Sequence, residues 1–154
     1  MKKILFFVLG VTIFLTTACS NSKIEYTADE VNYLDTMNAA INQLNNYLPK
    51  FQIALDERKS SKKTEDNARD VFAGGLALST IKSVLRTVTP PERFQEVHEE
   101  FLKGLGLVDE VSVALSTETG NEEEQAKFDE GNNLINQSSQ KILDAYEEAA
   151  DSSR

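Results

Sequence analysis

The first half of the chain carries an apolar repeat in which spacings of three and four residues alternate. The repeat consists of Leu34, Met37, Ile41, Leu44, Leu48, Phe51 and Leu55. This spacing places seven apolar side chains on one face of an α-helix, in the heptad pattern of helices that pack side by side, as in a coiled coil. Because such a face must be covered by other elements, the repeat predicts a long helix packed against partners.

The flanking residues indicate where this helix begins and ends. Thr27 and Glu30 have the spacing of a capping box, in which each side chain hydrogen-bonds an unpaired amide of the first turn. Pro49 lies inside the repeat and removes one backbone hydrogen bond. Because the apolar spacing continues beyond it, we expect a kink there rather than a break. The polar, basic stretch at residues 58–63 predicts the end of the helix.

Three further segments show helical periodicity. The second helix is predicted to begin after Thr64, because Thr is a common helix cap. The third is predicted to begin after Pro90 and Pro91, because Pro suits the first turn of a helix. The fourth is predicted to begin at Glu122, because carboxylates are favourable at the positive end of the helix dipole. Their apolar positions are Val71, Leu78, Ile81, Leu85 and Val88, flanked by Phe72, Leu76 and Val84; then Phe94, Val97, Phe101, Leu105, Val108, Val111 and Leu115; and finally Phe128, Leu134, Ile135, Ile142, Ala145, Tyr146 and Ala149.

Four amphipathic segments with short connections predict an all-α fold, an antiparallel up-down-up-down four-helix bundle over residues 26–150. Residues 151–154 are expected to fray. Trp is absent and Pro and Gly are few, which favours helices over a β-sandwich or barrel. In this topology the basic residues 58–63 and the acidic residues 118–124 would lie at the same end of the bundle.

The N-terminus has the layout of a secretory signal peptide. Lys2 and Lys3 precede residues 4–15, which carry no charge, and small residues then lead to Cys19, the only cysteine. The apolar run is too short to span a bilayer, which takes about 20 residues, so an uncleaved anchor is disfavoured. Residues 1–18 are therefore predicted to be removed. An ordinary cleavage after Ala18, which would leave Cys19 as a free thiol, is the alternative.

This stretch resembles the lipobox of bacterial lipoproteins, although Thr16 stands where that motif usually has Leu, Val or Ile. The resemblance implies that Cys19 carries a lipid, with acyl chains such as palmitate. It also implies that residues 19–25 form a lipidated N-terminus with a short tether, at the extracytoplasmic face of a cell membrane. Pro90-Pro91, His98 and Phe101-Leu102 are similar to a proline-started helix in small helical-bundle surface lipoproteins of low-GC Gram-positive bacteria.

Charge narrows the choice of partners. The formal net charge is −9, and removal of residues 1–18 would take away two lysines and no acid, which gives −11. A chain this acidic is poorly suited to binding nucleic acid, whose phosphates are bound mainly by Lys and Arg. It would also be repelled by anionic lipid head groups, so the folded part should stand off the membrane surface. A single cysteine allows no disulfide within the chain.

Few residues are candidates for catalysis or metal binding. His98 is the only histidine, and a di-metal site in a helical bundle needs two Glu-x-x-His units, whereas residue 95 is Gln. We therefore expect no catalytic residue, metal or cofactor, and interpret His98 as a boundary residue with one hydrogen bond. Four basic residues, Arg58, Lys59, Lys62 and Lys63, are candidates for docking an anionic partner such as a wall polymer, but we favour the interpretation that they form a soluble turn balanced by residues 118–124.

The sequence thus favours a non-enzymatic, membrane-anchored protein of the cell envelope that binds another macromolecule. The alternative is a small-ligand or ion-sensing protein at the cell surface. Its pocket would lie where glycines thin the second and third helices, near Gly74, Gly75, Gly104 and Gly106. An enzymatic function would have to rest on His98 alone.

Overall fold

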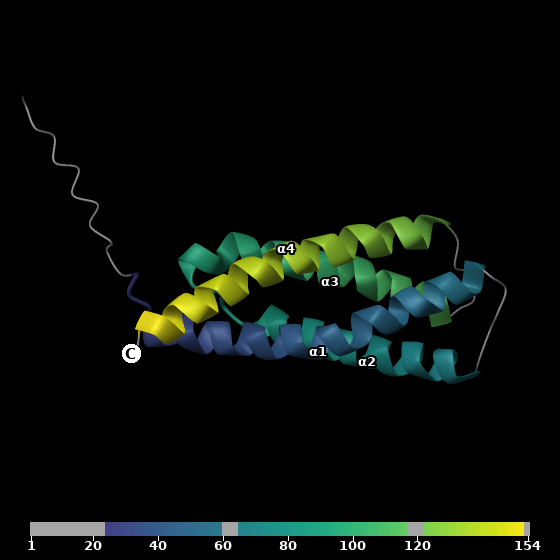
Figure 1. The fold of residues 1–154 in the computed structure, drawn as a ribbon, viewed down its shortest axis with the longest axis horizontal. Coiled ribbons are helices and arrows are strands. Elements are labelled where there is room, and N and C mark those ends of the chain that lie inside the picture. The colour runs from purple at the N-terminus through teal and green to yellow at the C-terminus, as the bar shows by residue number, and fades with distance from the viewer. Residues whose placement is uncertain (1–23, 60–64, 117–121, 153–154) are drawn as a thin grey trace, which may run out of the picture.

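A computed structural model describes residues 24–59, 65–116 and 122–152, with the side chains of residues 58, 59, 65–68 and 116 left undescribed. The described part of the chain is all-α and contains no strand. Its helices are α1 (Ala28–Lys59), α2 (Glu65–Thr87), the short 3₁₀ helix η1 (Glu92–Phe94), α3 (Gln95–Ser116) and α4 (Glu122–Ser152). The four long helices lie side by side in a bundle-like arrangement, and the end of α4 lies beside the start of α1 (Figure 1).

The sequence signals at the helix ends are seen in the structure. Thr27 and Glu30 form the capping box, with the Thr27 amide donating to Glu30 Oε2 at 2.8 Å and the Glu30 amide donating to Thr27 Oγ1 at 3.3 Å. Pro91 precedes η1, and α4 begins at Glu122. Helix α1 continues through Pro49 without a break. Helix α4 also continues through Asp151 and Ser152, two residues that the sequence assigned to a frayed tail.

The core forms where the apolar faces meet. All seven residues of the first repeat are buried, and so are all seven apolar positions predicted for the third helix. The largest completely covered side chains are Phe51, Phe101, Phe128, Leu34, Met37, Leu44, Leu78, Leu85, Leu105, Ile135, Ile142 and Val108. Helix α1 packs against α2 and α4, and α3 packs against the same two helices. Each long helix therefore covers two neighbours.

Three of the four glycines at the predicted pocket permit close packing of the helices. A Cβ on Gly74 would meet the Phe51 ring at 3.0 Å, and a Cβ on Gly104 would lie 2.8 Å from the carbonyl oxygen of Gly131. A Cβ on Gly75 would lie 3.2 Å from Ser112 Oγ. The space beside these three glycines is thus filled by neighbouring helices, whereas a Cβ on Gly106, the fourth glycine of the predicted pocket, would meet nothing within 4 Å.

Candidate functional site

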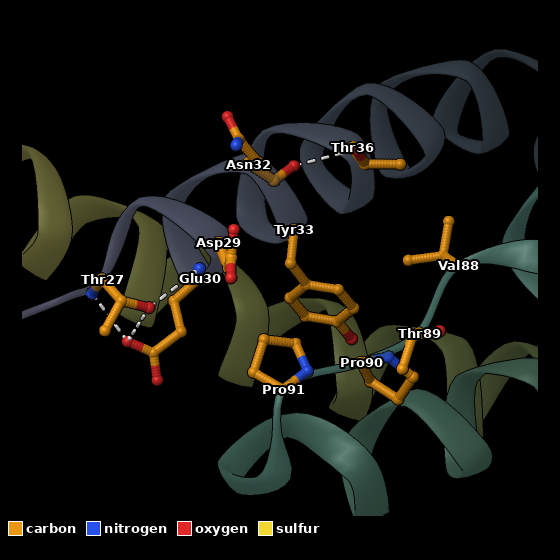
Figure 2. Close-up of a pocket in the computed structure, with 10 residues that line it drawn as sticks. All are labelled: Thr27, Asp29, Glu30, Asn32, Tyr33, Thr36, Val88, Thr89, Pro90 and Pro91. Atoms are coloured by element: carbon orange, nitrogen blue, oxygen red, sulfur yellow. Dashed lines mark hydrogen bonds between the residues drawn. The ribbon is translucent and has the colours of Figure 1, made fainter.

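The structure describes a groove of about 550 Å³ between the first turns of α1 and the segment that joins α2 to η1. Figure 2 shows Tyr33 extending from α1 toward Pro90 and Pro91, which form the opposite wall. The lining residues are Thr27, Asp29, Glu30, Asn32, Tyr33, Thr36, Val88, Thr89, Pro90 and Pro91. One wall is therefore polar and acidic, and the other is mainly apolar.

The α1 wall owes its position to the capping box and to an ion pair. Arg93 Nε donates to Glu30 Oε1 at 2.6 Å, which joins the first turn of α1 to η1. The Arg93 guanidinium, together with the Thr27 amide, lowers the pKa of the Glu30 carboxyl to about 2. Glu30 is thus charged and already paired, so Asp29 is the exposed carboxylate on the groove.

The same arginine anchors the segment that precedes α1. Its guanidinium carbon lies 4.1 Å from the centroid of the Tyr26 ring, a cation–π contact, and its Nη2 reaches the Glu25 carbonyl at 3.4 Å. Tyr26 donates its hydroxyl to Glu148 Oε2 at 3.0 Å, and Ser152 Oγ donates to the Ile24 carbonyl at 3.2 Å. Residues 24–27 are therefore fastened both to η1 and to the end of α4.

Tyr33 separates the groove from His98. The Tyr33 hydroxyl lies 3.2 Å from His98 Nδ1, and the Tyr33 ring stacks on Phe94 at a centroid distance of 5.2 Å. His98 is only 4% exposed and does not line the groove. Burial lowers its pKa, although a hydrogen bond to the backbone of Leu85 acts in the opposite direction. The sequence analysis placed His98 at the boundary of the core with one hydrogen bond, whereas the structure buries it and gives it two hydrogen-bonding contacts, to the Tyr33 hydroxyl and to the backbone of Leu85.

His98 is poorly placed to act on a molecule bound in the groove. Its Nδ1 faces the Tyr33 hydroxyl, and its ring is covered by the core. General acid–base catalysis requires a titrating group within hydrogen-bond reach of the substrate, either directly or through one water. Within the described ranges, no group of three His, Cys, Asp or Glu side chains could hold a metal ion. The groove offers binding contacts: an exposed carboxylate, hydroxyls, an amide and an apolar wall.

The other predicted site residues cannot be compared with the groove. Cys19, Lys62 and Lys63 lie outside the described residues, and the side chains of Arg58 and Lys59 are undescribed although both residues belong to α1. The predicted meeting of residues 58–63 with residues 118–124 falls in the same gaps. Sequence reasoning missed the groove itself, although its two walls carry the signals that marked helix starts, the capping box and the proline pair.

A smaller cavity of about 230 Å³ lies between α1 and α4 beside Pro49. Proline leaves the carbonyl one turn earlier without its helical partner, which is consistent with a local gap there. None of the described helices is long and apolar enough to cross a membrane. No protein-family model, curated protein or solved structure matches the chain.

Proposed function

We propose that this protein is a lipoprotein of the cell envelope, anchored to the membrane through Cys19, that binds another macromolecule and has no enzymatic activity. The feature that carries the proposal is the position of the lone cysteine. Cys19 follows an uncharged apolar run. Five residues after it, at Ile24, begins the segment that is hydrogen-bonded to η1 and to the end of α4. At about 3.3–3.6 Å per residue, those five residues reach at most roughly 18 Å.

The proposal gives the folded part an orientation. Because residues 24–27 are bound to η1 and to the end of α4, the groove and the end of α4 belong to the anchored end. A lipid on Cys19 would hold this end within a short distance of the membrane, while the net negative charge of the protein opposes contact with anionic head groups. The far ends of α1 and α3 would then be presented to partners.

We also propose that the four long helices form an antiparallel up-down-up-down bundle. Ion pairs between α3 and α4 support this topology, because the residue number on α4 falls as that on α3 rises. Glu100 pairs with Lys141, Lys103 with Glu130, and Glu110 with Lys127. Spin labels at the exposed positions Glu99 and Asp144 test it, since they would be close in an antiparallel α3–α4 pair and far apart in a parallel pair.

Intact-mass analysis of the membrane fraction tests the anchor. The expected species begins at Cys19 and carries a diacylglyceryl or triacyl modification, and Cys19→Ala should abolish both the modification and the membrane association. An unmodified chain beginning at Cys19 in the culture medium would contradict the anchor and the proposed orientation. Crosslinking in intact cells would then identify the envelope partner of the wild-type protein.

A small-ligand or ion-sensing function is the second candidate, and the groove of about 550 Å³ favours it. Its volume falls in the range of pockets that hold small molecules. A thermal-shift screen of cations, sugars and short peptides would test it, with Asp29→Asn as the groove variant and Asp35→Asn as the control, since Asp35 is exposed on α1 but does not line the groove. A stabilising ligand whose effect is lost only in Asp29→Asn would support it.

A further inference from the structure

The cavity of about 230 Å³ beside Pro49, which we call the Pro49 cleft, lies where one face of α1 meets one face of α4. Its lining residues are Asn45, Leu48, Pro49 and Gln52 of α1 and Phe128, Asn132 and Asn136 of α4. Spacings of three and four residues place each set on one side of its helix. Leu48 and Phe128 are buried, while Asn45, Pro49 and Asn136 are exposed, so the cleft has an apolar floor and a mainly polar rim.

The walls of the Pro49 cleft are uncharged, although 27% of the residues in the chain are charged. Four of the seven lining residues carry a carboxamide. The larger groove differs, since Asp29 and Glu30 line it. A carboxamide offers both an amide donor and a carbonyl acceptor. The cleft therefore suits ligand groups that donate and accept hydrogen bonds at the same atom, as hydroxyl groups do.

A chain of hydrogen-bonded side chains closes one edge of the cleft. Gln52 Nε2 donates to Asp56 Oδ1 at 2.9 Å. From α4, Gln125 Nε2 contacts Gln52 Oε1 at 3.4 Å and donates to Asp129 Oδ1 at 2.8 Å. These contacts hold Gln52 in place and set two exposed carboxylates at this edge. The carboxylates disfavour an anionic ligand in the cleft.

The rest of the cleft has hydrogen-bonding groups to spare. Asn136 Nδ2 reaches Asn132 Oδ1 at 3.4 Å, which leaves Asn132 Nδ2 and Asn136 Oδ1 without a partner among the described residues. The Asn45 carboxamide has none in this part of the chain either. The Asn45 backbone carbonyl lies one turn before Pro49, which has no amide to donate to it. Donors and acceptors thus face the cleft from both helices.

We infer that the Pro49 cleft binds a single uncharged sugar ring. The hydroxyl groups of the sugar bond the carboxamides of Asn45, Asn132 and Asn136, and a C–H face of the ring lies on the apolar floor. The volume is below the roughly 300 Å³ at which pockets for drug-sized ligands begin, which limits the ligand to one ring. Amino acids and nucleotides carry charges for which the lining has no partner. This site goes beyond the proposed function and depends neither on the anchor nor on the groove.

Titration of the full chain with sugars tests the site. Isotope-labelled protein is held in micelles of a detergent without a sugar head group, and amide NMR spectra report the side-chain NH₂ groups of Asn and Gln. The probes are glucose, galactose, mannose and N-acetylglucosamine. At least one should shift the NH₂ signals of Asn45, Asn132 and Asn136 saturably, with a dissociation constant in the millimolar range. Glucuronate, a sugar ring with a carboxylate, should bind roughly tenfold more weakly than the tightest neutral sugar.

Neighbouring asparagines on α4 provide a matched pair of variants. Asn132→Leu keeps the approximate size of the side chain but removes its hydrogen-bonding groups, and should weaken binding about tenfold or more. Asn133→Leu is the control, because Asn133 is exposed and does not line the cleft. Each variant loses one contact within α4, from Asn136 or from Gln137, so the two changes are comparable. Asn136→Leu, at the exposed rim, replaces Asn132→Leu if circular dichroism shows that the latter is misfolded.

Binding that is kept in Asn133→Leu and lost in Asn132→Leu or Asn136→Leu would support the site. Any of three results would overturn it: no saturable shift with any of the four sugars, equal binding by Asn133→Leu and the cleft variants, or a preference for glucuronate. Cys19→Ala should bind the sugar as the wild type does. Failure of the lipid anchor and failure of the sugar site are therefore distinguishable.

Discussion

Gly104 and Gly131 bring the backbones of α3 and α4 into contact. A Cβ on Gly131 would lie 2.9 Å from the carbonyl oxygen of Gly104 and 2.9 Å from Cγ2 of Val108. Real Cβ atoms do not approach other atoms so closely, and here the neighbour is a backbone atom that cannot rotate away. The pair therefore sets the distance between the two helices at this crossing.

Gly131→Ala should lower the free energy of unfolding by about 1–3 kcal/mol, because the added methyl group must push α3 and α4 apart. Urea denaturation followed by circular dichroism measures the change. Gly106→Ala is the control, since a Cβ there meets nothing within 4 Å. That variant should be neutral or gain up to about 1 kcal/mol from the better helix propensity of alanine. Equal effects of the two substitutions would contradict the close approach.

The ion pair of Glu30 with Arg93 should make stability depend on acidity. The pKa of Glu30 is about 2 in the folded protein and 4.5 as the reference for an unpaired carboxyl. Because the folded value is the lower one, the stabilisation is complete above pH 4.5 and is lost as the pH falls toward 2. Glu30→Gln should be less stable than wild type at pH 6, and the difference should shrink toward pH 2. Unfolding curves across this range provide the measurement.

Asp29→Asn is the natural comparison for that experiment. Asp29 occupies the same first turn but is exposed, so its replacement should leave most of the acid dependence in place. A pH profile unchanged by Glu30→Gln would show that the contact with Arg93 does not contribute to folding.

His98 should contribute a second pH dependence near neutrality. Burial lowers its pKa below the reference value of 6.5, so the unfolded chain binds its proton more readily than the folded protein. The groups facing it are the Tyr33 hydroxyl, the backbone of Leu85 and the Glu99 carboxylate, which favours the proton. The free energy of unfolding should therefore decrease as the pH falls below 6.5. His98→Gln should flatten the profile there, and an unchanged slope would contradict this assignment.

Tyr33→Phe tests the hydrogen bond between these two residues. The substitution keeps the stacking on Phe94 but leaves His98 Nδ1 without the hydroxyl that lies 3.2 Å away. Loss of one partner of a buried hydrogen bond costs about 1–3 kcal/mol. Tyr146→Phe, which changes a partly buried tyrosine packed at the edge of the core, is the matched control and should have a smaller effect on the denaturation midpoint. A double-mutant cycle with His98→Gln would isolate the coupling.

Ser138 should be a site of stabilisation. It is completely buried, and its Oγ has no hydrogen-bond partner among the residues that the structure describes. Ser138→Ala removes this oxygen and should raise the free energy of unfolding by about 1–2 kcal/mol. Ser112→Ala is the control, because Ser112 Oγ donates to the Asp109 carbonyl at 2.9 Å. Both changes add the same helix propensity, so a lower gain at Ser112 isolates the hydroxyl; equal gains would contradict the prediction.

The sequence by itself determined the helices and most of the core. The repeat from Leu34 to Leu55 and the apolar positions of α3 are buried as predicted. Residues spaced three and four apart lie on one face of a helix with 3.6 residues per turn, and an apolar face is covered when the helix packs against others. The capping box and the proline pair marked helix starts correctly, since these signals act over a few neighbouring residues.

Only the tertiary structure decided what lies between the helices. The glycines looked like a thin region suited to a pocket, but Gly74 accommodates the Phe51 ring and Gly104 accommodates α4. Likewise Phe72 and Leu76 flank a buried stripe in the sequence, yet both face outward, while the groove joins Tyr33 to prolines almost sixty residues away. Periodicity defines a face within one helix, but the rotation of that helix and the distance to its neighbours depend on how all four long helices fill space together.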